Sequence, residues 1–291
     1  MKPFISVVIS AIVTLSVGAT QDQGKKDDLV KAVLFYASFD EDVRADFGGG
    51  DLTLSTRSND PNEKGKFLFK KGIDSKMFRI APGKGIQGGA LEVVDVLPNN
   101  GRIFFPARGN IGFKKGGWSG AVSFWINTDP NKLLKTPFCD PVQITQKGAN
   151  NGGIWFDFNN AKPRDCRMGI FPSVPSGQKP IPEDDPKAPM VRVPAVKFKA
   201  GDWHHIVLTW KNLDTGKNDS QAVLYIDGKK KGSLENAQLA MDWDMEKAGI
   251  YVGVNFIGLM DELAIFGRML TSAEVTRLHK RFHLLATLKK R

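Results

Sequence analysis

The sequence predicts an all-β protein: an antiparallel β-sandwich of the jelly-roll kind that ends in a C-terminal helix. Apolar residues occupy alternate positions in the most regular segments, such as Ile206, Leu208 and Trp210, and this period of two is typical of strands with one face on a core. Such segments follow one another at short spacing, with turn residues between them. Thr271 and Glu274 then form a potential capping box at the start of a helix.

The first 31 residues are predicted to precede the folded domain. Residues 1–19 have the pattern of a secretory signal, with Lys2 before an apolar stretch at 4–17 and small residues where cleavage is expected. Retention as an N-terminal anchor is the alternative, although the segment is short for a spanning helix. Residues 20–31 are polar and are predicted to be a flexible leader. We expect a secreted, cell-envelope or periplasmic protein with no membrane span after signal removal.

A single domain is predicted over residues 32–270, followed by a helix and basic tail at 271–291. The strands are predicted at 33–39, 88–93, 102–106, 120–126, 142–146, 153–158, 203–210, 222–227, 229–234, 249–254 and 258–266, and the helix at 272–288. Asp227-Gly228 predicts a tight hairpin turn, because both central positions need positive φ. Six prolines between 172 and 189 predict a long surface loop, because proline removes donors from a strand ladder.

The charge of the chain restricts its partners. The formal net charge is +10, a balance that favours anionic polysaccharides, anionic surfaces or nucleic acid. The positive residues are nevertheless scattered, with runs only at 229–231 and 289–291, and the sequence contains no nucleic-acid-binding motif. We therefore expect no nucleic acid partner.

Cys139 and Cys166 are the two cysteines of the chain. They flank the strands predicted at 142–146 and 153–158, and a hairpin of these strands would bring its two ends together. In an exported protein this arrangement predicts a disulfide bond between them. Two free thiols are the alternative.

Aromatic and polar side chains recur at the strand positions that alternate with the core residues. If these strands are neighbours, one sheet face would carry aromatic rings among an acid, a carboxamide and a histidine. Sugars stack on aromatic faces and hydrogen-bond to planar polar groups, so this pattern predicts a glycan-binding face. Its expected residues are Trp125, Trp155, Asp157, Asn159, His205 and Tyr225. Alternatively, the tryptophans pack under loops and the polar groups meet water, as on the wet face of many antiparallel sheets.

Four stretches of the sequence carry a family resemblance. They read WHHIVLTW at 203–210, VLYIDGK at 223–229, GAVSFWI at 120–126 and GLMDELAIF at 258–266. Together they resemble the laminin-G-like members of the concanavalin A-like lectin/glucanase superfamily, over roughly residues 33–278. The resemblance implies the jelly-roll sandwich. It implies no single activity, because the superfamily holds lectins, adhesion modules, hydrolases and lyases.

The resemblance also bears on catalysis. Glucanases of this superfamily carry Glu-x-Asp-x-Glu on a cleft strand, because glycosidases need paired carboxylates across the scissile bond. The nearest string here is Asp242-Trp243-Asp244-Met245-Glu246, which lacks the first Glu and falls in a connection before the strand at 249–254. We therefore expect a solvated acidic loop and not a catalytic strand.

A structural calcium ion is a further implication of the resemblance. In several branches the final long strand carries an Asp that helps to hold Ca²⁺ near the N-terminal segment, and Asp261 stands at the matching position. Asp40, at the end of the first strand, could supply a second carboxylate among the six to eight oxygens that calcium takes. The alternative is that Asp261 caps a loop amide or pairs with a Lys or Arg.

These observations predict an exported, noncatalytic binding module, with an extracellular or envelope glycan as the expected ligand. A protein-interaction or adhesion module with a cell-surface protein as its partner is the second reading. A polysaccharide-cleaving enzyme is the third, and the missing paired-carboxylate motif argues against it.

Overall fold

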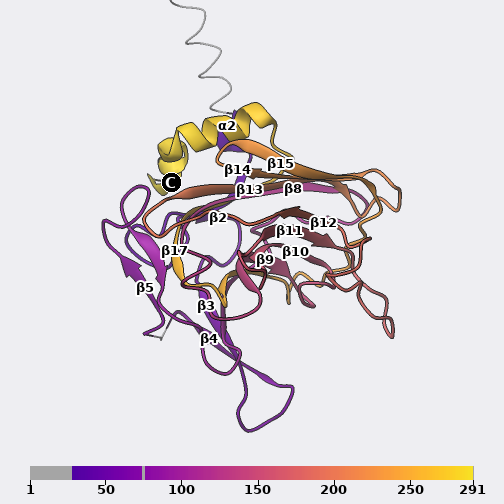
Figure 1. The fold of residues 1–291 in the computed structure, drawn as a ribbon, viewed down its shortest axis with the longest axis horizontal. Coiled ribbons are helices and arrows are strands. Elements are labelled where there is room, and N and C mark those ends of the chain that lie inside the picture. Colours follow the sequence, from indigo (N-terminus) through magenta and orange to yellow (C-terminus); the bar gives the residue numbers. More distant parts are fainter. Residues whose placement is uncertain (1–27, 74–75, 291) are drawn as a thin grey trace, which may run out of the picture.

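Two antiparallel β-sheets stacked face to face form the body of the protein, as predicted (Figure 1). The computed structural model describes residues 28–73 and 76–290. The predicted signal segment, and the leader up to residue 27, lie outside the described residues. No helix within the described ranges is long and apolar enough to cross a membrane.

One sheet, here called the helix-side sheet, lies next to the C-terminal helix. Its strands in spatial order are β15 (Lys229–Ala237), β14 (Ser220–Ile226), β13 (His204–Leu213), β8 (Trp118–Asn127), β17 (Gly258–Phe266), β1 (Val33–Ala37) and β2 (Phe47–Gly48). Two further strands extend it, because β6 (Ala90–Val93) pairs with β17 and β5 (Phe78–Ala81) pairs with β6.

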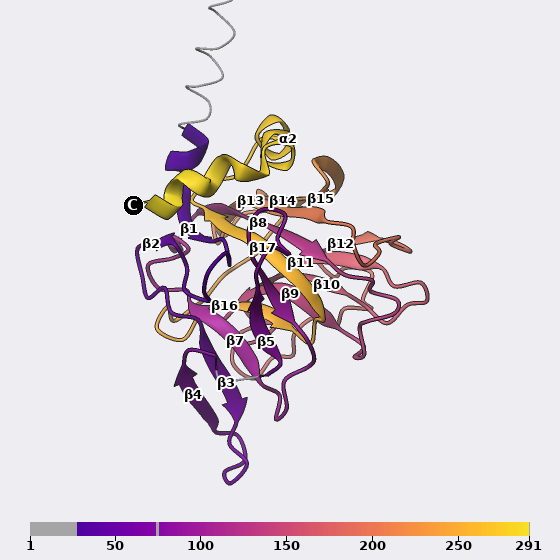
Figure 2. The same cartoon turned by 90° about the vertical axis from the view of Figure 1, so that its left-hand side faces the viewer.

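The other sheet, here called the far-side sheet, lies away from that helix. Its strands in spatial order are β12 (Met190–Val193), β11 (Cys166–Phe171), β10 (Gly153–Phe158), β9 (Cys139–Thr145), β16 (Gly249–Val254), β7 (Arg102–Pro106), β3 (Ser55–Asn59) and β4 (Phe67–Lys71). The hairpin of β3 and β4 projects beyond the body of the sandwich (Figures 1 and 2). The proline-rich stretch at 172–189 forms a long connection between β11 and β12, as predicted.

The main core fills the space between the sheets. Alternation places Ile206, Leu208 and Trp210 of β13 in it, as the sequence predicts. Across the interface, the rings of Phe124 and Phe156 meet edge to face with centroids 5.9 Å apart. The predicted turn after β14 is also present, because Asp227 has φ 52° and Gly228 has φ 74°.

The C-terminal segment packs on the outer face of the helix-side sheet (Figure 2). Helix α2 (Ser272–Lys280) begins with the predicted capping box, but it stops at Arg281, where φ is −126°. A 3₁₀ helix, η1 (Phe282–Lys290), continues the segment, so the single helix expected at 272–288 is in fact two. Leu29 joins this second core and is fully buried in a helical turn at 28–31, so this end of the predicted leader is packed.

Candidate functional site

The residues predicted to share one glycan-binding face lie on two different sheets. Trp125, His205 and Tyr225 belong to the helix-side sheet, whereas Trp155 and Asp157 belong to β10 of the far-side sheet. Because the sheets turn their outer faces in opposite directions, the two groups cannot line one groove. The prediction of a single face is therefore wrong in its grouping.

The group on the helix-side sheet is covered by the protein's own C-terminal segment. The Trp125 ring stacks on His205 with centroids 4.8 Å apart and on His279 of α2 at 5.4 Å. The Tyr225 and Ser272 hydroxyls are hydrogen-bonded at 2.9 Å, again linking the sheet to α2. All three predicted residues are buried, so they stabilise the docking of the helix and do not meet a ligand.

One row of side chains crosses the outer face of the far-side sheet. Residues paired across antiparallel strands project from the same face, and the pairing here is continuous from β4 to β12. In that order the row consists of Lys71, Ser55, Phe104, Tyr251, Gln143, Trp155, Gly169 and Met190. Their sequence neighbours, including Ile103, Phe105 and Ile144, point into the main core. The outer face is therefore aromatic and polar where the inner face is apolar.

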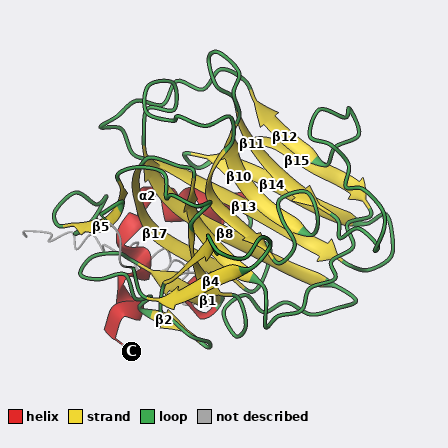
Figure 3. Cartoon of the chain, turned by 90° about the horizontal axis from the view of Figure 1, so that it is seen from below, coloured by secondary structure: helices red, strands yellow, loops and turns green. Residues whose placement is uncertain are grey.

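A pocket of about 240 Å³ lies over the middle of this row. Its walls come from β7, β9, β10 and β16 and from the loops near residues 138, 148 and 183. Figure 3, viewed from the side opposite the C-terminal helix, shows the loops around this side of the sandwich. Its lining includes Arg102, Phe138, Asp140, Gln143, Asp157 and Glu183. A second hollow of about 440 Å³ also uses Phe138 and Glu183, which makes the two pockets neighbours.

Arg167 of β11 organises one wall of the pocket. Its Nε and Nη2 atoms donate to the two carboxylate oxygens of Asp157 at 2.9 and 2.5 Å, and Nη2 also donates to Glu183 at 2.6 Å. Glu183 belongs to the long proline-rich loop, so this ion pair ties the loop to the sheet. A bidentate arginine–carboxylate pair of this kind holds both partners in one geometry.

Two aromatic rings flank the Arg167 guanidinium. Its central carbon lies 5.3 Å from the Trp155 ring centroid and 5.4 Å from that of Phe138. Trp155 is only 1% exposed and its indole N–H donates to the Ala149 carbonyl at 3.1 Å, so it supports Arg167 and is no open platform. Phe138 is 45% exposed and is the ring that a ligand would meet at this rim.

The buried acids of the pocket titrate unusually. Burial, reinforced by the charge of Asp157, raises the pKa of Asp140 well above its usual range. Burial also raises the pKa of Asp157 to about 6, although its hydrogen bonds from Arg167 act in the opposite direction. Perturbed acids in a cleft mark a candidate functional site, and here they accompany a cavity and fixed geometry.

Asn159, the remaining predicted ligand residue, has a structural role. Its side-chain oxygen accepts backbone N–H groups from Ala161 at 3.1 Å and Asp165 at 3.0 Å, and its amide nitrogen donates to the Asp165 carboxylate at 3.2 Å. These bonds shape the connection between β10 and β11, at the edge of the larger hollow.

The predicted disulfide is absent, and both cysteines are free and buried. Cys139 and Cys166 each pair with Phe158 of β10, but from opposite sides, because β9 and β11 flank that strand. Two interstrand spacings separate their Cα atoms by roughly 9–10 Å, whereas a disulfide needs less than about 7 Å. The hairpin does align the two ends, but the intervening strand keeps the thiols apart.

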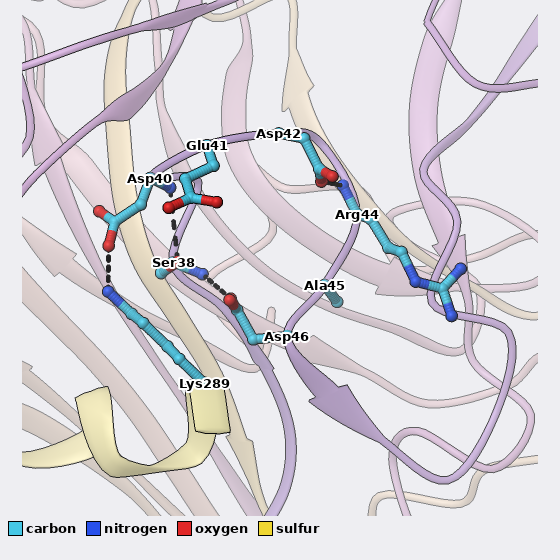
Figure 4. A pocket seen from close by; sticks show the side chains of 8 residues that line it. All are labelled: Ser38, Asp40, Glu41, Asp42, Arg44, Ala45, Asp46 and Lys289. Atoms are coloured by element: carbon cyan, nitrogen blue, oxygen red, sulfur yellow. Dashed lines mark hydrogen bonds and ion pairs between the residues drawn. The ribbon is translucent and has the colours of Figure 1, made fainter. Parts of the chain in front are cut away.

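The two acids predicted to hold calcium, Asp261 and Asp40, both accept backbone hydrogen bonds from the loop at 85–89. Asp261 Oδ2 accepts the Ile86 N–H at 2.8 Å, and Asp40 Oδ1 accepts the Gly89 N–H at 3.1 Å. The other Asp40 oxygen pairs with Lys289 at the edge of an acidic pocket, where Figure 4 shows the two side chains reaching toward each other. These contacts match the alternative to calcium binding, in which the acids accept hydrogen bonds from loop amides and pair with a lysine.

The donor chemistry around Asp261 is nevertheless of the type that calcium takes. A Cβ placed on Gly85 would lie 2.6 Å from Asp261 Oδ2 and 2.0 Å from the Gly89 carbonyl, so hard oxygens converge there. Burial raises the pKa of Asp261 to about 9, which a bound cation would reverse. The residues described contain no cluster of three metal-ligating acid, histidine or cysteine side chains. Calcium binding stays a prediction.

The acidic string at 242–246 lies in a connection between β15 and β16, as expected. Asp242 pairs with Lys115 at 2.9 Å and Asp244 with Lys247 at 2.9 Å, all of them largely exposed. Trp243 between them is buried in the main core. The string is thus a solvated loop anchored by one tryptophan.

Sequence reasoning missed most of the pocket. Arg102 and Phe104 alternate with core residues in β7, and Gln143 does so in β9, which was the available signal. Arg167 was missed because its partners, Asp157 and Glu183, come together only through the pairing of β10 with β11 and the return of the proline-rich loop.

A comparison with solved structures finds similar chains among proteins of several kinds. Domain 4 of an extracellular arabinanase from Geobacillus stearothermophilus, in complex with arabinotriose, is similar with a TM-score of 0.48 and 20% identity, over 85% of this chain and 98% of that one. The Trypanosoma rangeli sialidase has a TM-score of 0.51 and 10% identity, over 92% of this chain but 38% of its own. The Ruminococcus gnavus sialidase CBM40 bound to α2,3-sialyllactose has a TM-score of 0.45 and 12% identity, over 65% and 95%.

At these identities the structural likeness concerns the fold alone. A search of curated proteins finds no match to this sequence. The sequence profile described as the concanavalin A-like lectin/glucanases superfamily matches residues 99–276, more than half of the chain. These residues run from β7 into α2 and include most of the strands of both sheets. The chain belongs to the concanavalin A-like lectin/glucanases superfamily.

Proposed function

We propose that this protein binds carbohydrate in the pocket on the outer face of the far-side sheet. The observation that carries the proposal is a preformed cavity whose wall combines a fixed arginine–carboxylate network with an exposed aromatic rim. The opposite sheet offers no such surface, because its outer face is packed against the C-terminal segment.

The polar groups of the pocket suit the hydroxyl groups of a sugar. Arg102 donates, the Gln143 carboxamide both donates and accepts, and the Asp140 carboxyl oxygens accept. Arg102 Nη1 donates to Gln143 Oε1 at 3.4 Å, which orients the two planar groups. Phe138 adds an apolar ring on which a sugar face can stack. A mostly prearranged polar site with one stacking ring loses little side-chain entropy on binding.

Export is part of the same proposal, since an extracellular or envelope glycan would be met outside the cytoplasm. The sequence pattern at 1–19 supports it. Mass spectrometry of the protein recovered from its native cells tests this, and a mature chain beginning at Thr20 is the expected result. An intact N-terminus in a cytoplasmic fraction would contradict export.

A glycan array followed by calorimetric titration of the best binder tests the site. Phe138→Ala should weaken binding roughly tenfold, because it removes the apolar ring on which the C–H face of a sugar would pack, and should leave the melting temperature unchanged. Phe282→Ala is the matched control: that ring is 37% exposed but lies on the C-terminal segment, far from the pocket. It should leave glycan affinity unaltered.

Equal loss of affinity in the two variants would place the binding site elsewhere. If no glycan binds while a cell-surface protein is captured, and Phe138→Ala does not reduce that capture, the adhesion reading replaces this proposal. Both outcomes can be measured with wild type, Phe138→Ala and Phe282→Ala.

Glycan cleavage is a second candidate, favoured by the neighbouring buried acids Asp140 and Asp157. A raised pKa is what a general acid requires, but both oxygens of Asp157 are occupied by Arg167. Noncatalytic binding therefore fits the geometry better. Release of reducing ends from any bound polysaccharide, abolished in Asp140→Asn, would establish the enzyme; binding without release over a day would remove it.

A further inference from the structure

Beside the pocket, two arginines form a binding site for an anionic group, and we infer that the ligand is an acidic polysaccharide bearing carboxylate or sulfate substituents. This inference rests on the proposed carbohydrate binding and names its substrate class. The arginines are Arg57 of β3 and Arg102 of β7, which are directly paired across the two strands. Arg102 also lines the 240 Å³ pocket, so the anion site and the pocket are continuous.

Aromatic rings hold the Arg57 guanidinium in place. Its central carbon lies 4.3 Å from the Phe67 ring centroid and 5.4 Å from that of Tyr251, and Nη1 donates to the Tyr251 hydroxyl at 3.2 Å. A guanidinium held between two rings is restricted in orientation before any ligand arrives. Such a planar fork matches the two oxygens of a carboxylate or sulfate.

The two guanidinium groups lack an acidic partner within the part of the chain that the structure describes. Neither makes an ion pair there, and the Nε atoms of both are buried without a hydrogen-bond acceptor. Arg167 of β11 on the same sheet differs in this respect, because it forms ion pairs with the carboxylates of Asp157 and Glu183. Burial and the neighbouring charge of Arg57 lower the pKa of Arg102, and the opposing effect of Asp140 does not offset them. An incoming anion would neutralise these two charges and form charge-assisted hydrogen bonds with the guanidinium groups.

The protruding hairpin extends this surface. Phe69 pairs with Arg57 across β3 and β4, is 66% exposed, and meets Phe104 edge to face at 6.2 Å. Exposed rings beside an unpaired arginine pair offer stacking and charge to successive units of a polymer. A polysaccharide lying along the row would therefore run from the hairpin across the arginine pair into the pocket. The overall charge of +10 would speed its approach.

Calorimetric titration with polygalacturonate and with neutral galactan tests the inference, with free galacturonate and galactose as small probes. Wild type should bind the acidic member of each pair at least tenfold more tightly. Arg57→Gln, which lies outside the pocket lining, should remove most of that preference while leaving neutral-sugar binding nearly unchanged. Arg102→Gln should also remove the preference, but because Arg102 lines the pocket it should weaken binding of the neutral sugar as well. Arg79→Gln is the charge-matched control: its partner is Glu92 at 2.6 Å, on the edge of the helix-side sheet, and it should behave as wild type.

The outcomes separate the two proposals. Equal affinity for acidic and neutral sugars, or an equal loss in Arg57→Gln and Arg79→Gln, overturns the acidic ligand while carbohydrate binding stands. Absence of binding to any sugar overturns both. Binding of polyglutamate or single-stranded DNA as tightly as polygalacturonate assigns the arginine pair to unspecific charge attraction and overturns the inference. A fall in melting temperature does not obscure these results, because galacturonate binding is compared with galactose binding in the same variant.

Discussion

The indole ring of Trp125 on strand β8 stacks against the imidazole of His279 on helix α2, with ring centroids 5.4 Å apart and planes 17° apart. This contact joins the middle of the sandwich to its last helix. Helix α2 also contributes Val275 and Leu278 to a second apolar cluster, which includes Tyr225 of the same sheet. The C-terminal segment is therefore part of the folded domain and covers one of its two outer faces.

Truncating Trp125 should destabilise the protein without changing glycan affinity. Its ring is buried between the sheet and α2, so Trp125→Ala leaves a cavity, and we expect a loss of about 3–5 kcal/mol in the free energy of unfolding. Denaturant unfolding measures the loss. At a temperature where the variant is still folded, its affinity for the ligand found on the array should equal that of wild type. Weaker binding by the folded variant would show that the helix-side face takes part after all.

His205 should make the protein sensitive to mild acid. Complete burial, with His279 nearby, lowers its pKa to about 3 from the usual 6.5. The folded protein thus binds fewer protons than the unfolded chain between these values. The stability contribution of the neutral imidazole is complete above pH 6.5 and is lost as pH falls toward 3. His205→Gln can keep a hydrogen bond to Ser123, now 2.8 Å from the ring, but does not titrate.

The measurement is the melting temperature of both proteins between pH 7.5 and 4. The wild-type advantage over His205→Gln should shrink as the pH is lowered. Asp157, whose pKa of about 6 is raised, has the opposite effect, since its penalty for ionisation disappears in acid. Comparing the two proteins cancels this contribution, because both retain Asp157. If the difference in melting temperature between wild type and His205→Gln stays constant from pH 7.5 to 4, His205 is not a neutral, buried histidine.

Both cysteines should be free thiols that react only after unfolding. Burial raises the pKa of the Cys139 and Cys166 thiols, so neither forms the reactive thiolate at neutral pH. Labelling with a thiol reagent should give no adduct on the native protein and two adducts on protein denatured without reductant. Mass spectrometry counts them. Absence of label after denaturation would restore the disulfide and require rearrangement of β10.

Calcium should raise the stability of the folded protein if the oxygens around Asp261 hold it. An ion that binds the native state alone stabilises it by mass action, by about 2.7 kcal/mol at a hundredfold excess over its dissociation constant. Thermal unfolding in millimolar calcium and in chelator provides the test. Identical curves would remove the ion. A calcium-dependent rise that persists in Asp261→Ala would keep the ion but move its site.

The period-two pattern was sufficient to predict the strands, because a strand buries one side of its chain whatever its partners are. The predicted bounds of the strands at 102–106, 153–158, 249–254 and 258–266 agree with the structure. The capping box at Thr271 and the turn at Asp227 were predictable for the same reason, since both rest on contacts between residues close in sequence.

The candidate site could not be predicted from this pattern. Alternation shows that a side chain points away from the main core, but it does not show which residues that side chain contacts. Trp125 and Trp155 have the same pattern in sequence, yet one lies under the C-terminal helix and the other under Arg167. Pairing of β3 with β7 brings Arg57 beside Arg102, and only the tertiary structure determines this. The sequence by itself determined the strands, the turn and the helix cap, because the stability of each depends on residues that are close together in the sequence. The order of strands decided which face is covered and which carries the charges, because those contacts join residues far apart in the chain.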